Sequence, residues 1–117
     1  MIDLSPPVLV GLGGAAGALL RYVTTALLDA ESFPFGTLAV NVVGSFALGL
    51  VTFTGIGSDV VLLAGVGACG AYTTFSSFAY DTVRLVETGH LRLAVGNATG
   101  TLVAAVAGVG LAWLLVG

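Results

Sequence analysis

Four long apolar segments alternate with short polar segments along the 117-residue chain. The apolar segments cover residues 8–28, 35–53, 60–83 and 91–116. Each has roughly 20 residues or slightly more, enough for a helix to cross a hydrocarbon core of about 30 Å. Because the connecting loops are short, neighbouring helices must run antiparallel. The pattern predicts an all-α, multi-pass protein of the cell membrane, with residues 1–117 forming one integral-membrane domain.

Composition supports the membrane class and excludes nucleic acid as a partner. The chain is 57% hydrophobic and 8% charged, whereas soluble domains carry about 25% charged residues. It has no lysine and only three arginines, which are Arg21, Arg84 and Arg92. Such a chain has no basic patch for nucleic acid. Its single cysteine, Cys69, cannot form an internal disulfide bond.

The orientation in the membrane is poorly specified by charge. Arg84 and Arg92 flank the third loop, which would place that loop in the cytoplasm. Two arginines are a small bias, and Arg21 lies inside the first span. Insertion in both orientations therefore remains open.

Two glycine pairs predict close helix packing. Gly13 and Gly17 share one face of the first span, and Gly96 and Gly100 share one face of the fourth. In lipid, small residues at this spacing let helix backbones approach each other. The spans contain no Ser/His/Asp set and no carboxylate pair, so we do not expect an enzyme.

Polar residues inside the spans have two readings. Thr37, Asn41 and Ser45 are four residues apart and share a helix face, and Asn97 and Thr101 repeat this spacing. A single hydroxyl in a membrane helix usually bonds to its own helix backbone. Two asparagines on separate spans instead favour a polar pathway, because buried polar groups in a membrane are costly.

The charges inside the spans favour structural roles. Asp81 lies three residues before Arg84, a spacing that favours an ion pair. Arg21 is expected to bind backbone carbonyls, or an acid such as Asp81, at a helix interface. Attraction of anions into a vestibule is the alternative for Arg21.

The stretch "GACGAYTTFSSF", residues 67–78, predicts a break in the third span. Gly67 and Gly70 weaken the helix, and Thr74 is placed to cap the helix that resumes. A broken helix at membrane depth needs surrounding protein or a cavity. Phe75 and Phe78 lie one turn apart, and simple packing is their favoured reading from spacing alone. The positive ring edges could otherwise face an anion.

Three stretches together resemble the Fluc/CrcB family of fluoride channels. Residues 67–78 resemble its third-helix signature, G-x-x-G-x-x-T-T-F-S-T-F. "FGTLAVNVVGSFALG", residues 35–49, resembles its second-helix signature, and "GGAAGALLRY", residues 13–22, resembles its first-helix signature. The resemblance extends over the whole chain, because length, span number and motif order all agree.

The resemblance implies a passive fluoride channel built as an antiparallel, dual-topology homodimer. Backbone carbonyls of Gly70 and Thr73 would hold a structural Na⁺ at the dimer centre. The fluoride pathway would be lined by Thr37, Asn41, Phe75, Ser76, Phe78 and Thr101.

The sequence leaves other interpretations open besides a homodimeric fluoride channel. Some members of the family act as pairs of oppositely oriented paralogues, so a second chain is possible. Asn97 and Ala105 stand where relatives often carry Tyr and Ser, which leaves the fourth-helix side of the pathway in question. A small multidrug or proton-coupled transporter also has four spans, but it needs a carboxylate in an early span. A purely structural membrane protein is the third reading.

Overall fold

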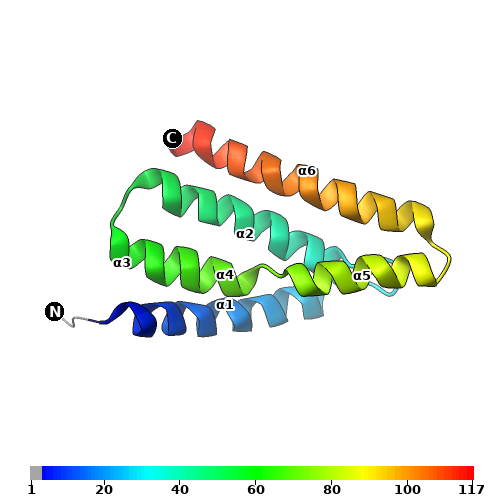
Figure 1. Ribbon diagram of the computed structural model, residues 1–117, viewed down its shortest axis with the longest axis horizontal. Coiled ribbons are helices and arrows are strands. Elements are labelled where there is room, and N and C mark those ends of the chain that lie inside the picture. The colour runs from blue at the N-terminus through cyan, green and yellow to red at the C-terminus, as the bar shows by residue number, and fades with distance from the viewer. Residues whose placement is uncertain (1–3) are drawn as a thin grey trace.

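The computed structural model describes residues 4–117 and contains only helices and loops. Helices α1 (Pro6–Leu28), α2 (Phe35–Thr54) and α6 (Leu91–Val116) are continuous, and the third span covers Ser58–Glu87. All four spans are long and apolar enough to cross a membrane. The described chain ends at the same side as it starts (Figure 1). The protein is therefore a multi-pass membrane protein, as predicted.

The third span is assembled from several pieces, in agreement with the predicted break. The pieces are α3 (Ser58–Val60), the π-helical η1 (Val61–Cys69), α4 (Gly70–Tyr72) and α5 (Phe75–Glu87). The chain becomes extended at Thr73, with φ −81° and ψ 158°, and at Thr74, with φ −150° and ψ 120°. Figure 1 shows this gap between α4 and α5.

The glycines expected to cause the break lie inside helical turns. Gly70 has φ −61° and ψ −38°, which is ordinary helical geometry. Gly67 packs its backbone on α1, where an added Cβ would lie 2.7 Å from the Val10 carbonyl oxygen. The helix therefore stops after the glycines, and α5 then continues four residues past the predicted end at residue 83.

Helix α1 packs on η1 through backbone contacts, and α2 packs on α6. A Cβ at Gly13 would collide with the Leu63 carbonyl, and one at Gly17 would collide with the Ala68 carbonyl. This confirms the predicted packing face on the first span. Nothing lies within 4 Å of the Cβ positions of Gly96 and Gly100. The face that carries this second pair is therefore open in the single chain, and its packing stays a prediction.

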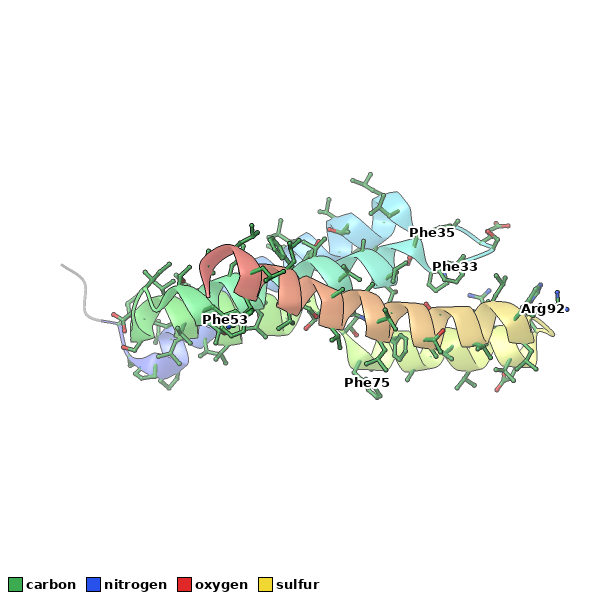
Figure 2. All side chains as sticks on the ribbon, turned by 90° about the horizontal axis from the view of Figure 1, so that it is seen from above. Phe33, Phe35, Phe53, Phe75 and Arg92 are labelled. Carbon is green, nitrogen blue, oxygen red and sulfur yellow. The ribbon has the colours of Figure 1, made fainter. Side chains whose placement is uncertain are left out.

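The chain is a flat slab rather than a sphere. Its principal extents are 55 × 29 × 19 Å, and its accessible surface is 7196 Å². A compact monomer of this mass would expose roughly 5,800 Å². Much of the excess is apolar side chains that cover the outside of every span (Figure 2). Such a surface suits contact with lipid or with another protein chain.

Candidate functional site

Asn41 on α2 binds both backbone polar groups of Thr74 at the break. Its Oδ1 accepts the Thr74 N–H at 2.8 Å, and its Nδ2 donates to the Thr74 carbonyl at 3.1 Å. Exposed backbone groups at membrane depth are costly unless protein satisfies them. The Asn41 amide therefore replaces the peptide partners that Thr74 would have in a continuous helix. The break at Thr73 and Thr74 thus lies opposite a side chain that satisfies its backbone.

Thr74 also caps the helix that follows the break, as predicted. Its Oγ1 accepts the backbone N–H of Ser77 at 3.2 Å and lies 3.4 Å from the Ser76 hydroxyl. A side-chain oxygen at this position satisfies one of the free N–H groups of a first helical turn. The positive end of the α5 dipole consequently points at the break.

A cavity of about 310 Å³, here called the break cavity, lies beside these residues. It brings together five of the residues predicted for the fluoride pathway or the sodium site and four others. Among described residues, none of its lining side chains is charged. The lining residues are Asn41, Ser45, Thr73, Thr74, Phe75, Phe78, Thr101, Leu102 and Ala105.

The two phenylalanines form one edge of the break cavity. Their ring centroids are 6.0 Å apart with the planes inclined by 50°. The Phe75 side chain is 80% exposed and projects away from the helices in Figure 2. An aromatic ring that packs within its own chain would be covered, so packing inside this chain does not account for Phe75.

A second cavity of about 410 Å³, here called the loop-end cavity, holds the other predicted pathway residues. Thr37 and Ser76 line it rather than the break cavity. It lies near the C-terminal end of α1 and the first turns of α2 and α5. Its lining residues are Thr25, Asp29, Thr37, Ser76, Ser77, Tyr80 and Asp81.

Asp81 is held by α2 rather than by its own helix. The Thr37 hydroxyl donates to Asp81 Oδ2 at 3.0 Å, and Thr37 is 2% exposed. Among the described residues, Asp81 makes this contact between helices and no salt bridge with Arg84, although both side chains line one pocket. The sequence could not show it, because it depends on how α2 and α5 pack.

Arg21 lies close to the break and donates to the Thr73 carbonyl at 3.4 Å. This is the contact with a backbone carbonyl expected of a structural arginine. In a continuous α-helix the Thr74 N–H would donate to the nearby Gly70 carbonyl. Here the Thr74 N–H donates to Asn41 instead. The break thus frees carbonyl oxygens at the end of α4.

Asn97, the second asparagine that favoured a polar pathway, instead connects α6 to α5 and lines neither the break cavity nor the loop-end cavity. Its Nδ2 donates to the Thr82 hydroxyl at 2.9 Å, and Thr82 donates to the Phe78 carbonyl at 2.8 Å. Thr101 donates to Asn97 Oδ1 at 3.5 Å. Asn97 is 1% exposed. Through these hydrogen bonds it helps to fix the positions of Phe78 and Thr101. Its signal in the sequence was an amide inside an apolar span, four residues before Thr101.

Several hydroxyls behave as ordinary helix residues. Ser45 donates to the Asn41 carbonyl at 2.6 Å, and Thr73 donates to the Cys69 carbonyl at 3.0 Å. For these two residues the structure confirms the reading in which a hydroxyl in a membrane helix bonds to its own backbone.

Comparison with known proteins identifies the family. Residues 8–114 match the family described as CrcB-like protein, Camphor Resistance (CrcB). The chain belongs to the CrcB family. A CrcB relative from Haloarcula marismortui, named fluoride-specific ion channel FluC 2, is 55% identical over 99% of this chain and 98% of its own. A relative from Halobacterium salinarum, fluoride-specific ion channel FluC 1, is 51% identical over 95% and 93%.

More distant CrcB relatives carry the same kind of name. A fluoride-specific ion channel FluC from Methanocaldococcus jannaschii is 44% identical over 76% of both chains. CrcB proteins are thus named as ion channels and not as enzymes, which confirms the expectation that this chain is no enzyme. The family membership also confirms the resemblance noted in the three sequence motifs.

Proposed function

We propose that the protein is a passive, fluoride-selective ion channel that lets fluoride leave the cytoplasm. The observation that carries this proposal is the near full-length similarity to a protein named as a fluoride-specific ion channel, at 55% identity. The break cavity adds chemistry suited to a small anion. Among described residues it offers amide, hydroxyl and ring-edge groups and no charged side chain.

Fluoride can be stabilised in such a cavity by donors that other contacts leave free. The Asn41 amide has two N–H groups, and one is used by the Thr74 carbonyl. The second is available to an anion. The N-terminal end of α5 adds positive partial charge, and the edges of Phe75 and Phe78 add more. A fixed positive charge would trap the ion, whereas these groups bind weakly enough to release it.

A passive channel is sufficient for this role. Hydrogen fluoride is a weak acid whose neutral form crosses membranes and ionises inside, so fluoride accumulates in the cytoplasm. A pathway for the anion lets it leave down its own gradient. The proposal is tested with purified protein in liposomes loaded with potassium fluoride, with valinomycin to balance charge. Fluoride release faster than from protein-free liposomes supports it, and release only of organic cations under a pH gradient favours the transporter reading.

The functional unit is an antiparallel, dual-topology dimer, with a homodimer as the simplest form. Two observations support this dimer: the single chain has excess accessible surface, and the apolar ring of Phe75 is exposed and would be buried by a second chain. Gly70 also has open space around it, so a second copy could approach the break. The small arginine bias permits both insertions. A paralogous second chain could cover the same exposed surface.

A structural Na⁺ binds at the dimer centre through the Gly70 and Thr73 carbonyls of two chains. Carbonyl oxygens suit hard cations, and the break frees such groups. The long contact from Arg21 to Thr73 leaves a second lone pair on that oxygen. The ion would bind only the assembled dimer and stabilise it by mass action. Dimer dissociation measured in Na⁺ and in N-methylglucamine tests this, and equal stability in both would remove the sodium site.

A further inference from the structure

We propose that Asp29 is a positioning residue for the loop-end part of the fluoride pathway. This inference rests on the proposed function. Asp29 follows the last residue of α1, where its backbone N–H donates to the Thr25 carbonyl at 3.0 Å. From this fixed base its carboxylate reaches across the loop to the first turn of α2. No motif in the sequence marks it.

The first turn of α2 needs a partner that its own sequence does not supply. Pro34 stands at the cap position, and no side chain there caps the helix. The free N–H groups of a first turn require an acceptor when water is scarce. Asp29 Oδ1 accepts the N–H of Gly36 at 2.7 Å and that of Thr37 at 3.3 Å. A carboxylate is a favourable acceptor here because of the helix dipole.

Gly36 makes this approach possible. A Cβ at this position would lie 2.7 Å from Asp29 Oδ1 and 2.6 Å from the Thr25 Cα. Any other residue would push the end of α1 away from the start of α2. The glycine and the carboxylate thus form one fitted contact between the two helices.

Through Thr37 the contact reaches a third helix. The backbone of Thr37 is bound by Asp29, and its buried hydroxyl donates to Asp81 Oδ2 at 3.0 Å. Asp29, Thr37 and Asp81 all line the loop-end cavity. Asp29 therefore orients Thr37, and Thr37 holds the Asp81 carboxylate against the positive end of α2. There the Thr37 hydroxyl and the helix dipole partly offset the negative charge of Asp81, whereas a carboxylate without these contacts would repel passing fluoride more strongly.

Five variants in the fluoride-release assay test this chain of contacts. Asp29→Ala removes the acceptor and should lower fluoride flux about fivefold, in line with the loss of a capping side chain. Asp29→Asn keeps the acceptor oxygen without the charge and should stay within about twofold of wild type, since Asn and Asp cap equally well. Glu31→Ala, an exposed carboxylate of the same loop, is the matched control.

The double variant separates positioning from an independent role. If Asp29 acts through Thr37, then Asp29→Ala combined with Thr37→Val should conduct no less than Thr37→Val alone. Multiplied losses in the double variant, or an Asp29→Asn variant as impaired as Asp29→Ala, would overturn the inference. If Asp29→Ala fails to assemble as a dimer, Asp29→Asn decides: near wild-type flux supports the inference, and a fivefold loss overturns it.

Fluoride flux through the wild-type protein distinguishes failure of the proposed function from failure of the role proposed for Asp29. A wild-type protein without fluoride flux overturns the proposed function together with this inference. Wild-type flux that is unchanged in Asp29→Ala overturns the inference alone.

Discussion

At the scale of single residues, Asn41 has a role that its place in the sequence did not reveal. The spacing of Thr37, Asn41 and Ser45 predicted a polar face on the second span. Asn41 and Ser45 do line the break cavity, whereas Thr37 lines the loop-end cavity. The sequence could not show that the Asn41 amide binds the Thr74 backbone at both of its polar atoms. Such a pairing depends on two helices meeting at one height.

We predict that Asn41→Asp lowers fluoride flux at least tenfold. An ionised carboxylate donates no hydrogen bond, so the contact with the Thr74 carbonyl and the donor for fluoride are both lost. The added charge also repels the anion. Flux is measured in the liposome assay, with Thr54→Ala, an exposed hydroxyl at the far end of α2, as control. Near wild-type flux in dimeric Asn41→Asp protein would place Asn41 outside the pathway.

We predict that Phe75→Ile with Phe78→Ile abolishes most fluoride flux while the dimer still forms. Isoleucine keeps much of the apolar bulk but has no positive ring edge. Size-exclusion chromatography reports assembly, and fluoride release reports conduction. Phe53→Ile, near the other end of α2, is the matched control. Full flux in the double variant would mean that the two rings only pack.

At the scale of helices, the sequence was sufficient for what depends on local pattern. Four apolar segments predicted four spans, and the glycine pair in the first span predicted a packing face, which in the structure contacts the third span. The break falls at Thr73 and Thr74, inside the predicted stretch 67–78, while Gly67 and Gly70 stay helical. The sequence could not show that Asn41 on α2 binds the backbone freed there. For the same reason the partner of Asp81 was missed: a side chain on another helix outcompeted Arg84. Positions set by tertiary contacts are invisible to local pattern.

We predict that Gly17→Ala destabilises the protein, by about 1–3 kcal/mol as in overpacked cores. Its Cβ would collide with a backbone carbonyl, which cannot turn aside as a side chain can. Gly11→Ala in the same helix meets nothing within 4 Å and should be neutral or stabilising, since Ala favours helix. Thermal unfolding in detergent compares the two, and equal melting temperatures would show that α1 is not tightly packed.

At the scale of the whole molecule, the single chain exposes surface that the proposed dimer would cover. The chain is flat, its exterior is apolar, and Phe75 in the lining of the break cavity is exposed. Arg92 lies at the end of the molecule opposite the described chain start (Figure 2). With so few arginines to choose an orientation, the charge pattern is compatible with the proposed dimer of oppositely inserted copies.

We predict that a single cysteine at the C-terminus is labelled from both sides of the membrane. The variant is Gly117→Cys in a Cys69→Ser background, which removes the only native thiol. In oriented membrane vesicles, an impermeant maleimide should modify about half of the chains before permeabilisation and the rest afterwards. Labelling from one side alone would contradict the dual-topology homodimer and point to a paired second chain.

The central claim is that the protein conducts fluoride passively and selectively. The most direct measurement is the reversal potential of the purified protein in a planar bilayer, with a tenfold fluoride gradient and chloride as the replacing anion. A fluoride-selective channel should reverse near the fluoride equilibrium potential, about 59 mV in magnitude for a monovalent ion. A reversal potential near zero, or one that follows chloride, would contradict the account.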